Sequence, residues 1–263
     1  MRRHMIVAAL GSLYCLIAAD PKPDADQQKK TLEAARDIAI HYTSKLPNFI
    51  CTEQVQRSTQ DTVAPTRPTL NQQDTLTIQL SFAGQKEQYK LVAMNGRPTT
   101  TPLESLDGLI TGGEFGTQLL GVFDPSSAAD FQWKEWTTLR KRHAAVYTYR
   151  IARDKSHYIL GHRADNGSMQ EWAAGYHGEV VLDNETNKVL RLTASADDIP
   201  KQAGIDLSSV EIDYDFVDVA GHSHLLPAHS DSRMERPDRK VSNVVTFNGY
   251  KKFEVDSTID FKE

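Results

Sequence analysis

The stretch "VEIDYDF", residues 210–216, decides the fold. Apolar and acidic residues alternate along it: Val210, Ile212, Tyr214 and Phe216 point to one side, and Glu211, Asp213 and Asp215 point to the other. Burying four such apolar side chains is worth about 1.5–3 kcal/mol each. We therefore predict a half-buried β-strand whose acidic residues face water.

Turn signals divide much of the remaining chain into further strands. Strand-forming runs cover residues 49–58, 75–82 and 86–94, and the third ends at Asn95-Gly96, a strong hairpin signal. Similar signals occur at Ala83-Gly84, Ala220-Gly221, Asn248-Gly249 and 183–188, whereas 59–74 has a loop-like composition. Strands joined by hairpins are antiparallel, so we expect a meandering antiparallel sheet.

Two segments break the strand pattern. Residues 27–46 carry apolar side chains at alternating spacings of three and four, which predicts an amphipathic helix ending before Pro47. Residues 102–123 read as two short helical pieces separated by Gly112-Gly113, an insert that would cover one face of the sheet. The predicted fold class is therefore α+β, with an antiparallel sheet packed against an N-terminal helix and a short helical insert.

The N-terminus predicts export. Residues 1–19 have a basic start and a short apolar run that ends in small residues, which is typical of a secretory signal; a retained N-terminal anchor is the alternative. Residues 20–26 form a polar leader, and 27–263 show no composition break, so we expect this part of the chain to form one domain. Because of the predicted signal, we expect this domain in the periplasm or outside the cell. Cys51 is the only cysteine after residue 19, and its apolar neighbours favour burial over pairing between chains.

Charge and missing motifs narrow the function. The net charge is −5, and removal of Arg2 and Arg3 with the signal makes it −7, which argues against a nucleic-acid partner. No GxSxG nucleophile elbow is present, and the glycines of GGEFG (112–116) lack the Lys-Ser/Thr of a phosphate loop. We expect no cofactor.

Two polar patterns carry possible chemistry. The stretch "GHSHLLPAH" (221–229) places His222 and His224 on one face of a strand, and a bend at Pro227 would let His229 join them around a metal ion. Exposed histidines on a hairpin arm are the alternative interpretation. Asp213 and Asp215 also share a face, as paired catalytic carboxylates do, although acidic residues on the water side of a strand are ordinary.

Aromatic and basic residues suggest a binding role. Tyr147 and Tyr149 share a face with Ile151, and these residues are candidates to line an apolar pocket or to fill the core. The complete set of candidate ligand contacts adds Trp133, Phe115 and Leu119. The basic turn "LRKRH" (139–143) would meet an anionic lipid head or form a solvated hairpin tip.

Three stretches resemble the periplasmic lipoprotein-carrier (LolA/LolB-like) superfamily. They are "LPNFICTEQVQ" (46–56), where the helix leads into a strand, "YKLVAMNGRPT" (89–99), a strand with a glycine turn, and the hairpin "GEVVLDNETNKVLRLTASAD" (178–197). The resemblance implies a curved sheet that forms an incomplete barrel, closed by helices around a cavity for acyl chains. It also extends to exported bacterial proteins with no assigned activity.

These observations support three hypotheses. The leading one is an exported, non-enzymatic protein that holds an apolar or acylated ligand, a lipid or lipoprotein, on the concave face and is at most peripheral to the membrane. The second is an envelope protein-interaction or sensor module with a filled interior. The third is a metal-dependent hydrolase that uses the histidines of 221–229.

Overall fold

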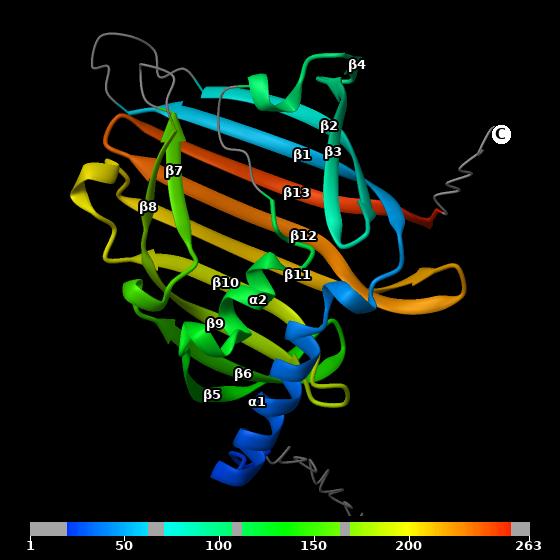
Figure 1. The fold of residues 1–263 in the computed structure, drawn as a ribbon, viewed down its shortest axis with the longest axis vertical. Helices are drawn as coiled ribbons and strands as arrows, with labels where there is room; N and C mark the ends of the chain where they lie inside the picture. The colour runs from blue at the N-terminus through cyan, green and yellow to red at the C-terminus, as the bar shows by residue number, and fades with distance from the viewer. Residues whose placement is uncertain (1–19, 63–70, 107–111, 164–168, 254–263) are drawn as a thin grey trace, which may run out of the picture.

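An open antiparallel sheet of eleven strands dominates the computed structural model, which describes residues 20–62, 71–106, 112–163 and 169–253 (Figure 1). The predicted signal, residues 1–19, lies outside the described residues. The strands are β1 (Phe49–Asp61), β2 (Asn71–Ala83), β3 (Lys86–Met94), β4 (Arg97–Pro98), β5 (Asp130–Leu139), β6 (Arg142–Ile151), β9 (Gly175–Asp183), β10 (Val189–Asp197), β11 (Leu207–Val219), β12 (His222–Arg236) and β13 (Arg239–Lys252). A separate hairpin consists of β7 (Ile159–Arg163) and β8 (Met169–Ala173). The predicted fold class is confirmed: the sheet is curved and does not close into a barrel (Figure 1).

The sheet consists of two meanders, β1–β4 and the strands from β5 to β13, which are joined where β1 lies beside β13. The order β4-β3-β2-β1-β13-β12-β11-β10-β9-β6-β5 follows the chain except where β1 lies beside β13 and β9 beside β6. Every pair is antiparallel, as the hairpin signals predict. The β1–β13 pairing runs from Phe49 with Lys252 to Asp61 with Arg239, so the end of the described chain covers what would otherwise be an open sheet edge.

One predicted turn is wrong. Asn95-Gly96 and Ala220-Gly221 do connect strands, but Asn248-Gly249 lies inside β13. There the β1–β13 register shifts between Ile50 and Thr52, and Gly249 has a φ of 67°. Positive φ suits a glycine in a β-bulge as well as in a hairpin turn, so the dipeptide alone did not distinguish the two.

The helices occupy the predicted places with shorter bounds. The α-helices are α1 (Ala25–Ile40) and α2 (Thr117–Phe123), and the 3-10 turns are η1 (Thr43–Lys45), η2 (Leu103–Ser105), η3 (Pro125–Ser127), η4 (Arg153–Lys155) and η5 (Lys201–Ala203). A reciprocal capping box between Asp24 and Gln27 starts α1 two residues earlier than the pattern predicted. None of the helices in the described ranges has the length and apolarity that a bilayer crossing requires.

The polar leader is attached to the fold. The indole nitrogen of Trp136 donates to the carbonyl of Pro21 at 2.9 Å, and His143 lies 3.1 Å from the carboxylate of Asp20. Both partners belong to the β5–β6 hairpin. The leader is therefore held where α1 crosses this end of the sheet (Figure 1).

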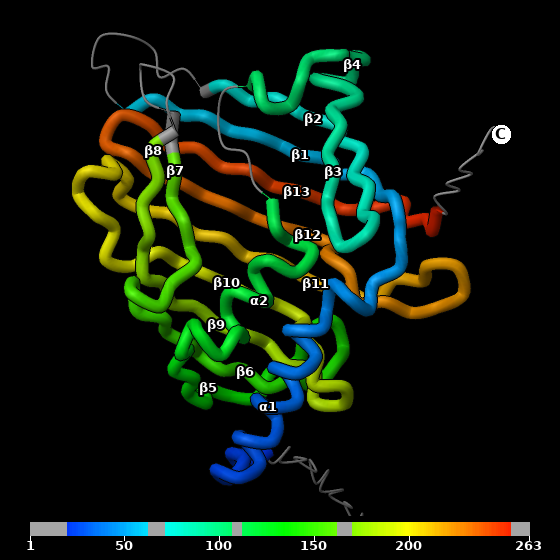
Figure 2. The backbone as a smooth tube through the Cα atoms, in the orientation of Figure 1, coloured from blue at the N-terminus to red at the C-terminus, as the bar shows by residue number. Residues whose placement is uncertain are grey.

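α1, α2 and the β7–β8 hairpin all lie over one face of the sheet, which we call the covered face (Figure 2). Side chains fill most of the space beneath them. One cluster lies under α1 and α2 and includes Tyr147, Leu192 and Tyr214; a second lies over β1, β2 and β13 and includes Phe49, Leu80 and Phe115. Cys51 is buried in the second cluster, as its neighbours predicted.

Candidate functional site

A small apolar cavity remains on the covered face, beside the second cluster. It has a volume of about 260 Å³. The sheet contributes inward-facing residues of β1, β2, β3 and β13, and the loop before α2 closes the opposite side. The lining residues are Glu53, Val55, Arg57, Leu76, Ile78, Tyr89, Leu103, Gly112, Glu114, Asn243 and Val245.

Glu53 is the unexpected member of this lining. Alternation along β1 turns Phe49, Cys51, Glu53 and Val55 to the covered face. The Glu53 side chain is only 5% exposed, and no hydrogen bond or ion pair to it is found among the described residues. A buried carboxyl group without a partner is energetically costly, so its presence at the cavity wall calls for a chemical reason.

Glu114 approaches the same cavity from the loop before α2. Phe115 anchors this loop, because its buried ring packs at 5.4 Å from the ring of Phe49 and at 5.5 Å from that of Phe247. The Glu114 carbonyl accepts a hydrogen bond of 3.0 Å from the Tyr214 hydroxyl, and its carboxyl group lies 3.4 Å from the Ser230 hydroxyl. The Glu114 residue is 4% exposed, so the cavity has two buried carboxyl groups.

Both carboxyl groups resist ionisation. Burial, reinforced by the nearby Glu114 and Glu87, raises the pKa of Glu53 from 4.5 to about 8. Burial also raises the pKa of Glu114 to about 7, with Glu87 adding to the effect. The cation at the cavity wall, Arg57, forms an ion pair of 2.6 Å with Asp74. The site therefore combines an apolar wall with an excess of acidic groups.

A second cavity of about 360 Å³ lies on the other side of the same loop. Gly112 and Glu114 border both cavities. Tyr158, Tyr176 and Met234 are among the residues of its wall, which has more polar groups than the first cavity. One of them, the hydroxyl of Ser232, is buried with no hydrogen-bond partner among the described residues.

The six residues predicted to contact a ligand do not surround either cavity. Five of them, Tyr147, Tyr149, Ile151, Phe115 and Leu119, are at most 2% exposed and pack within the core, and Trp133 packs against it. Phe115 belongs to the second cluster and the others to the first, so the structure separates them. Their positions match the alternative given in the sequence analysis, that these side chains fill the core and do not line a pocket.

The three histidines are not gathered into one site. His222 and His224 stand at the start of β12, opposite Val219 and Val217, whereas His229 stands opposite Asp213 beyond a β-bulge. Across the described ranges, no group of three or more His, Cys, Asp or Glu side chains has the arrangement of a metal site. Pro227 lies within β12 and does not turn the chain back, so the condition under which His229 would join His222 and His224 is not met.

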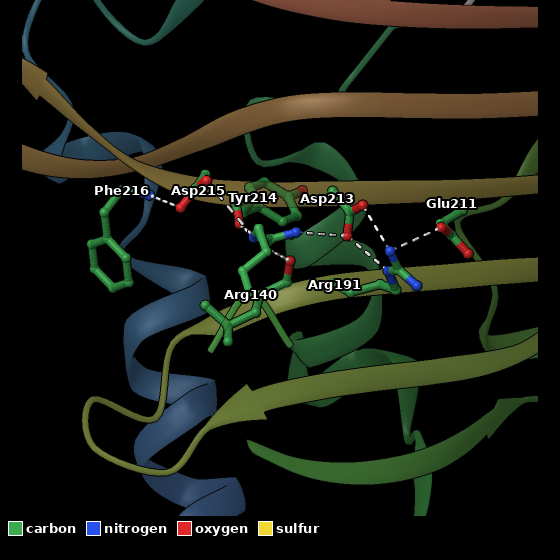
Figure 3. A network of polar contacts seen from close by, with 8 residues as sticks. Arg140, Arg191, Glu211, Asp213, Tyr214, Asp215 and Phe216 are labelled. Atoms are coloured by element: carbon green, nitrogen blue, oxygen red, sulfur yellow. Dashed lines mark hydrogen bonds and ion pairs between the residues drawn. The ribbon is translucent and has the colours of Figure 1, made fainter. Parts of the chain in front are cut away.

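Asp213 corrects the expectation that every acid of 210–216 faces water. Its residue is only 9% exposed, and it accepts two hydrogen bonds from Arg191, at 2.7 and 2.8 Å (Figure 3). Burial alone would raise the pKa of Asp213, but the hydrogen bonds and charge of Arg191 outweigh it and hold the pKa below its ordinary value. This side of β11 faces away from α1. The pair of Asp213 and Arg191 is therefore a structural ion pair on the uncovered face of the sheet.

Arg140 lies in the exposed β5–β6 turn, the hairpin tip that the sequence offered as one alternative for 139–143, and extends the same network. Its guanidinium group lies 3.3 Å from Asp213 and 3.7 Å from Asp215 (Figure 3). It also donates to the carbonyls of Leu190, at 3.1 Å, and Tyr214. β10 and β11 pair only as far as Arg191 with Asp213, so Arg140 satisfies carbonyls at the point where the strands separate.

Sequence reasoning missed Glu53 and Glu114, although one signal was present. In "FICTEQVQ" (49–56) the inward positions are Phe, Cys, Glu and Val, so a carboxylate interrupts an apolar face. Glu114 offered no such signal, because only the packing of Phe115 turns this loop toward β1.

Comparisons with known proteins give distant structural matches only. No protein-family model matches the sequence, and no curated protein matches it. The matching structures include a LolA superfamily protein from Nitrosomonas europaea, with 11% identity, a TM-score of 0.34 and coverage of 89% of this chain and 97% of that one. A domain from Vibrio parahaemolyticus described as an outer membrane lipoprotein-sorting protein has 9% identity, a TM-score of 0.37 and coverage of 88% and 95%.

A third match is a DUF1329 family protein from Desulfovibrio piger, with 12% identity, a TM-score of 0.35 and coverage of 87% of this chain and 95% of that one. The matches thus include the superfamily that the sequence resembles. At such identities and TM-scores they assign neither a ligand nor an activity to this chain.

Proposed function

We propose that this chain is an exported, non-enzymatic binding protein that holds an apolar or acylated ligand in the cavity bordered by Val55, Ile78 and Val245. The supporting observation is the cavity itself, an apolar hollow of about 260 Å³ whose wall has fewer polar groups than that of the neighbouring 360 Å³ cavity. Its volume lies just below the usual range of about 300–1,000 Å³ for ligand pockets, so it suits a single chain or a small ring. Burial of hydrocarbon would supply about 0.8 kcal/mol per methylene.

Calorimetric titration with octan-1-ol, an uncharged eight-carbon chain, tests this proposal. Val245→Phe places a larger side chain in the cavity. If it excludes about two methylenes at ~0.8 kcal/mol each, affinity falls about tenfold. Val244→Phe is the matched control, because Val244 directly precedes Val245 in β13 and faces the uncovered side. We expect it to leave the affinity within about twofold.

Extraction of the purified protein with organic solvent, followed by mass spectrometry, provides an independent test. A bound apolar molecule that is lost in Val245→Phe supports the proposal. A preparation without such a molecule that also fails to bind octan-1-ol contradicts it. That result would favour the interaction-module hypothesis, which the extensive filling of the interior also suits.

A further inference from the structure

Glu53 and Glu114 add a chemical preference to the proposed cavity. They approach it from opposite sides, Glu53 from β1 and Glu114 from the loop before α2. Both residues are more than nine-tenths buried, and Glu53 has no polar partner among the described residues. An apolar ligand without a polar group would leave Glu53 in that state, so the cavity wall is complementary to a ligand that also carries a hydrogen-bonding or charged group.

The charges around Glu53 favour a cation over a neutral donor or an anion. Titratable and charged groups reach this region from every element packed around it: Cys51 and Arg57 of β1, Asp74 of β2, Glu87 and Tyr89 of β3, Tyr250 of β13, and Glu114. Arg57 is already paired with Asp74, and the Tyr89 hydroxyl donates to Glu87. Acidic groups are therefore in excess where a ligand head would lie. Glu53 itself is protonated at pH 7, but a carboxylate there would be repelled by Glu87 and by the partly ionised Glu114, whereas both would attract a cation.

We propose that the cavity recognises an amphiphile with an apolar chain and a protonated amine, whose ammonium group pairs with Glu53. This inference rests on the proposed function and narrows its ligand class. The ammonium group supplies the donor and the counter-charge that Glu53 lacks, and the chain occupies the apolar wall of Val55, Leu76, Ile78 and Val245.

Proton release is a specific consequence. Burial keeps Glu53 protonated at neutral pH, since its pKa is about 8. A neighbouring ammonium group favours the carboxylate, so Glu53 gives up its proton when the amine binds. Calorimetry at pH 7 in two buffers with different ionisation enthalpies will detect up to one proton released per octylamine and none per octan-1-ol.

A series of matched eight-carbon ligands tests the preference. We expect octylamine to bind at least about tenfold more tightly than octanoate at pH 7, with octan-1-ol between them. Glu53→Gln keeps the shape but removes the charge, so we expect it to weaken octylamine binding about tenfold, abolish proton release and leave octan-1-ol within about twofold. Glu104→Gln is the control, because Glu104 is exposed in η2, next to the lining residue Leu103.

The outcomes separate this inference from the proposed function. Two outcomes overturn the amine preference. One is that octanoate binds as tightly as octylamine, and the other is that Glu53→Gln does not weaken the binding of octylamine. If octan-1-ol still binds and Val245→Phe blocks it, the apolar cavity stands without that preference. If no eight-carbon ligand binds, the proposed function fails as well. Circular dichroism and urea unfolding of each variant will establish that a lost affinity does not reflect a lost fold.

Discussion

Replacing Glu53 by Gln should stabilise the protein, and the gain should depend on pH. An acid whose pKa is higher in the folded state must take up a proton on folding once the pH exceeds its unfolded pKa. The free energy of unfolding therefore falls as the pH rises from the pKa of the acid in the unfolded state to its pKa in the folded state, and it is lowest above that range. For Glu53 these limits are 4.5 and about 8. Gln has nearly the same shape and no such proton equilibrium.

The magnitude follows from the interval between these pKa values. At pH 7 the interval above 4.5 is 2.5 units, and each unit corresponds to about 1.36 kcal/mol, so Glu53→Gln should raise the free energy of unfolding by about 3 kcal/mol. Near pH 4.5 the gain should almost vanish, because Glu53 is then largely protonated in the folded state and about half protonated in the unfolded one.

Urea unfolding of both proteins between pH 4.5 and 8.5 measures this difference. Urea is preferable to guanidinium chloride because it adds no salt that would screen charges. With a slope of ~3 kcal/mol per molar urea, the expected gain at pH 7 moves the midpoint by about 1 M. Glu104→Gln removes the same charge at an exposed position and should track the wild type throughout.

Two results would refute the reasoning. One is a difference between Glu53→Gln and the wild type that stays constant from pH 5 to pH 8, because the effect would then not come from a proton. The other is a variant less stable than the wild type at pH 7, because the Glu53 carboxylate would then have a stabilising partner.

Three further substitutions test the sheet and its core by urea unfolding at pH 7. Asp213→Ala removes two charge-assisted hydrogen bonds from Arg191, which keeps only Glu211 at 3.4 Å, and should lose about 2 kcal/mol; the loss should shrink as the pH falls toward the lowered pKa of Asp213 and this carboxylate becomes protonated. Gly178→Ala would place its Cβ 1.9 Å from the Thr193 carbonyl oxygen, so the backbone must shift, at about 2 kcal/mol or more. Leu80→Ala empties a fully buried position and should lose about 2–5 kcal/mol.

Controls and contrary outcomes are available for each of these predictions. Asp206→Ala removes an exposed carboxylate and should change the free energy of unfolding by less than about 0.5 kcal/mol. An Asp213→Ala loss that is as large at pH 2 as at pH 7 would show that charge is not its cause. A Gly178→Ala variant as stable as the wild type would contradict the close approach of β9 and β10. A Leu80→Ala loss below 1 kcal/mol would contradict tight packing in the second cluster.

The sequence by itself determined the features that depend on neighbours along the chain. Alternation in 210–216 sets which side of β11 meets the core, and the spacing of apolar residues in 27–46 sets the helix that covers it. Asn95-Gly96 and Ala220-Gly221 fix hairpins for the same reason, since the conformation of a two-residue turn depends on those two residues. The antiparallel sheet and its covering helix therefore follow from local patterns.

Only the tertiary structure decided where polar and aromatic groups end up. Whether Asp213 is solvated depends on Arg191 and Arg140, which reach it from β10 and from the β5–β6 turn. Whether Tyr147 lines a cavity or fills the core depends on how closely α1 and α2 approach the sheet. Glu53 becomes a ligand-binding candidate only because the packing of Phe115 brings Glu114 to the cavity opposite it. Such contacts join residues distant in sequence, and burial, which sets their energies, is a property of the assembled fold.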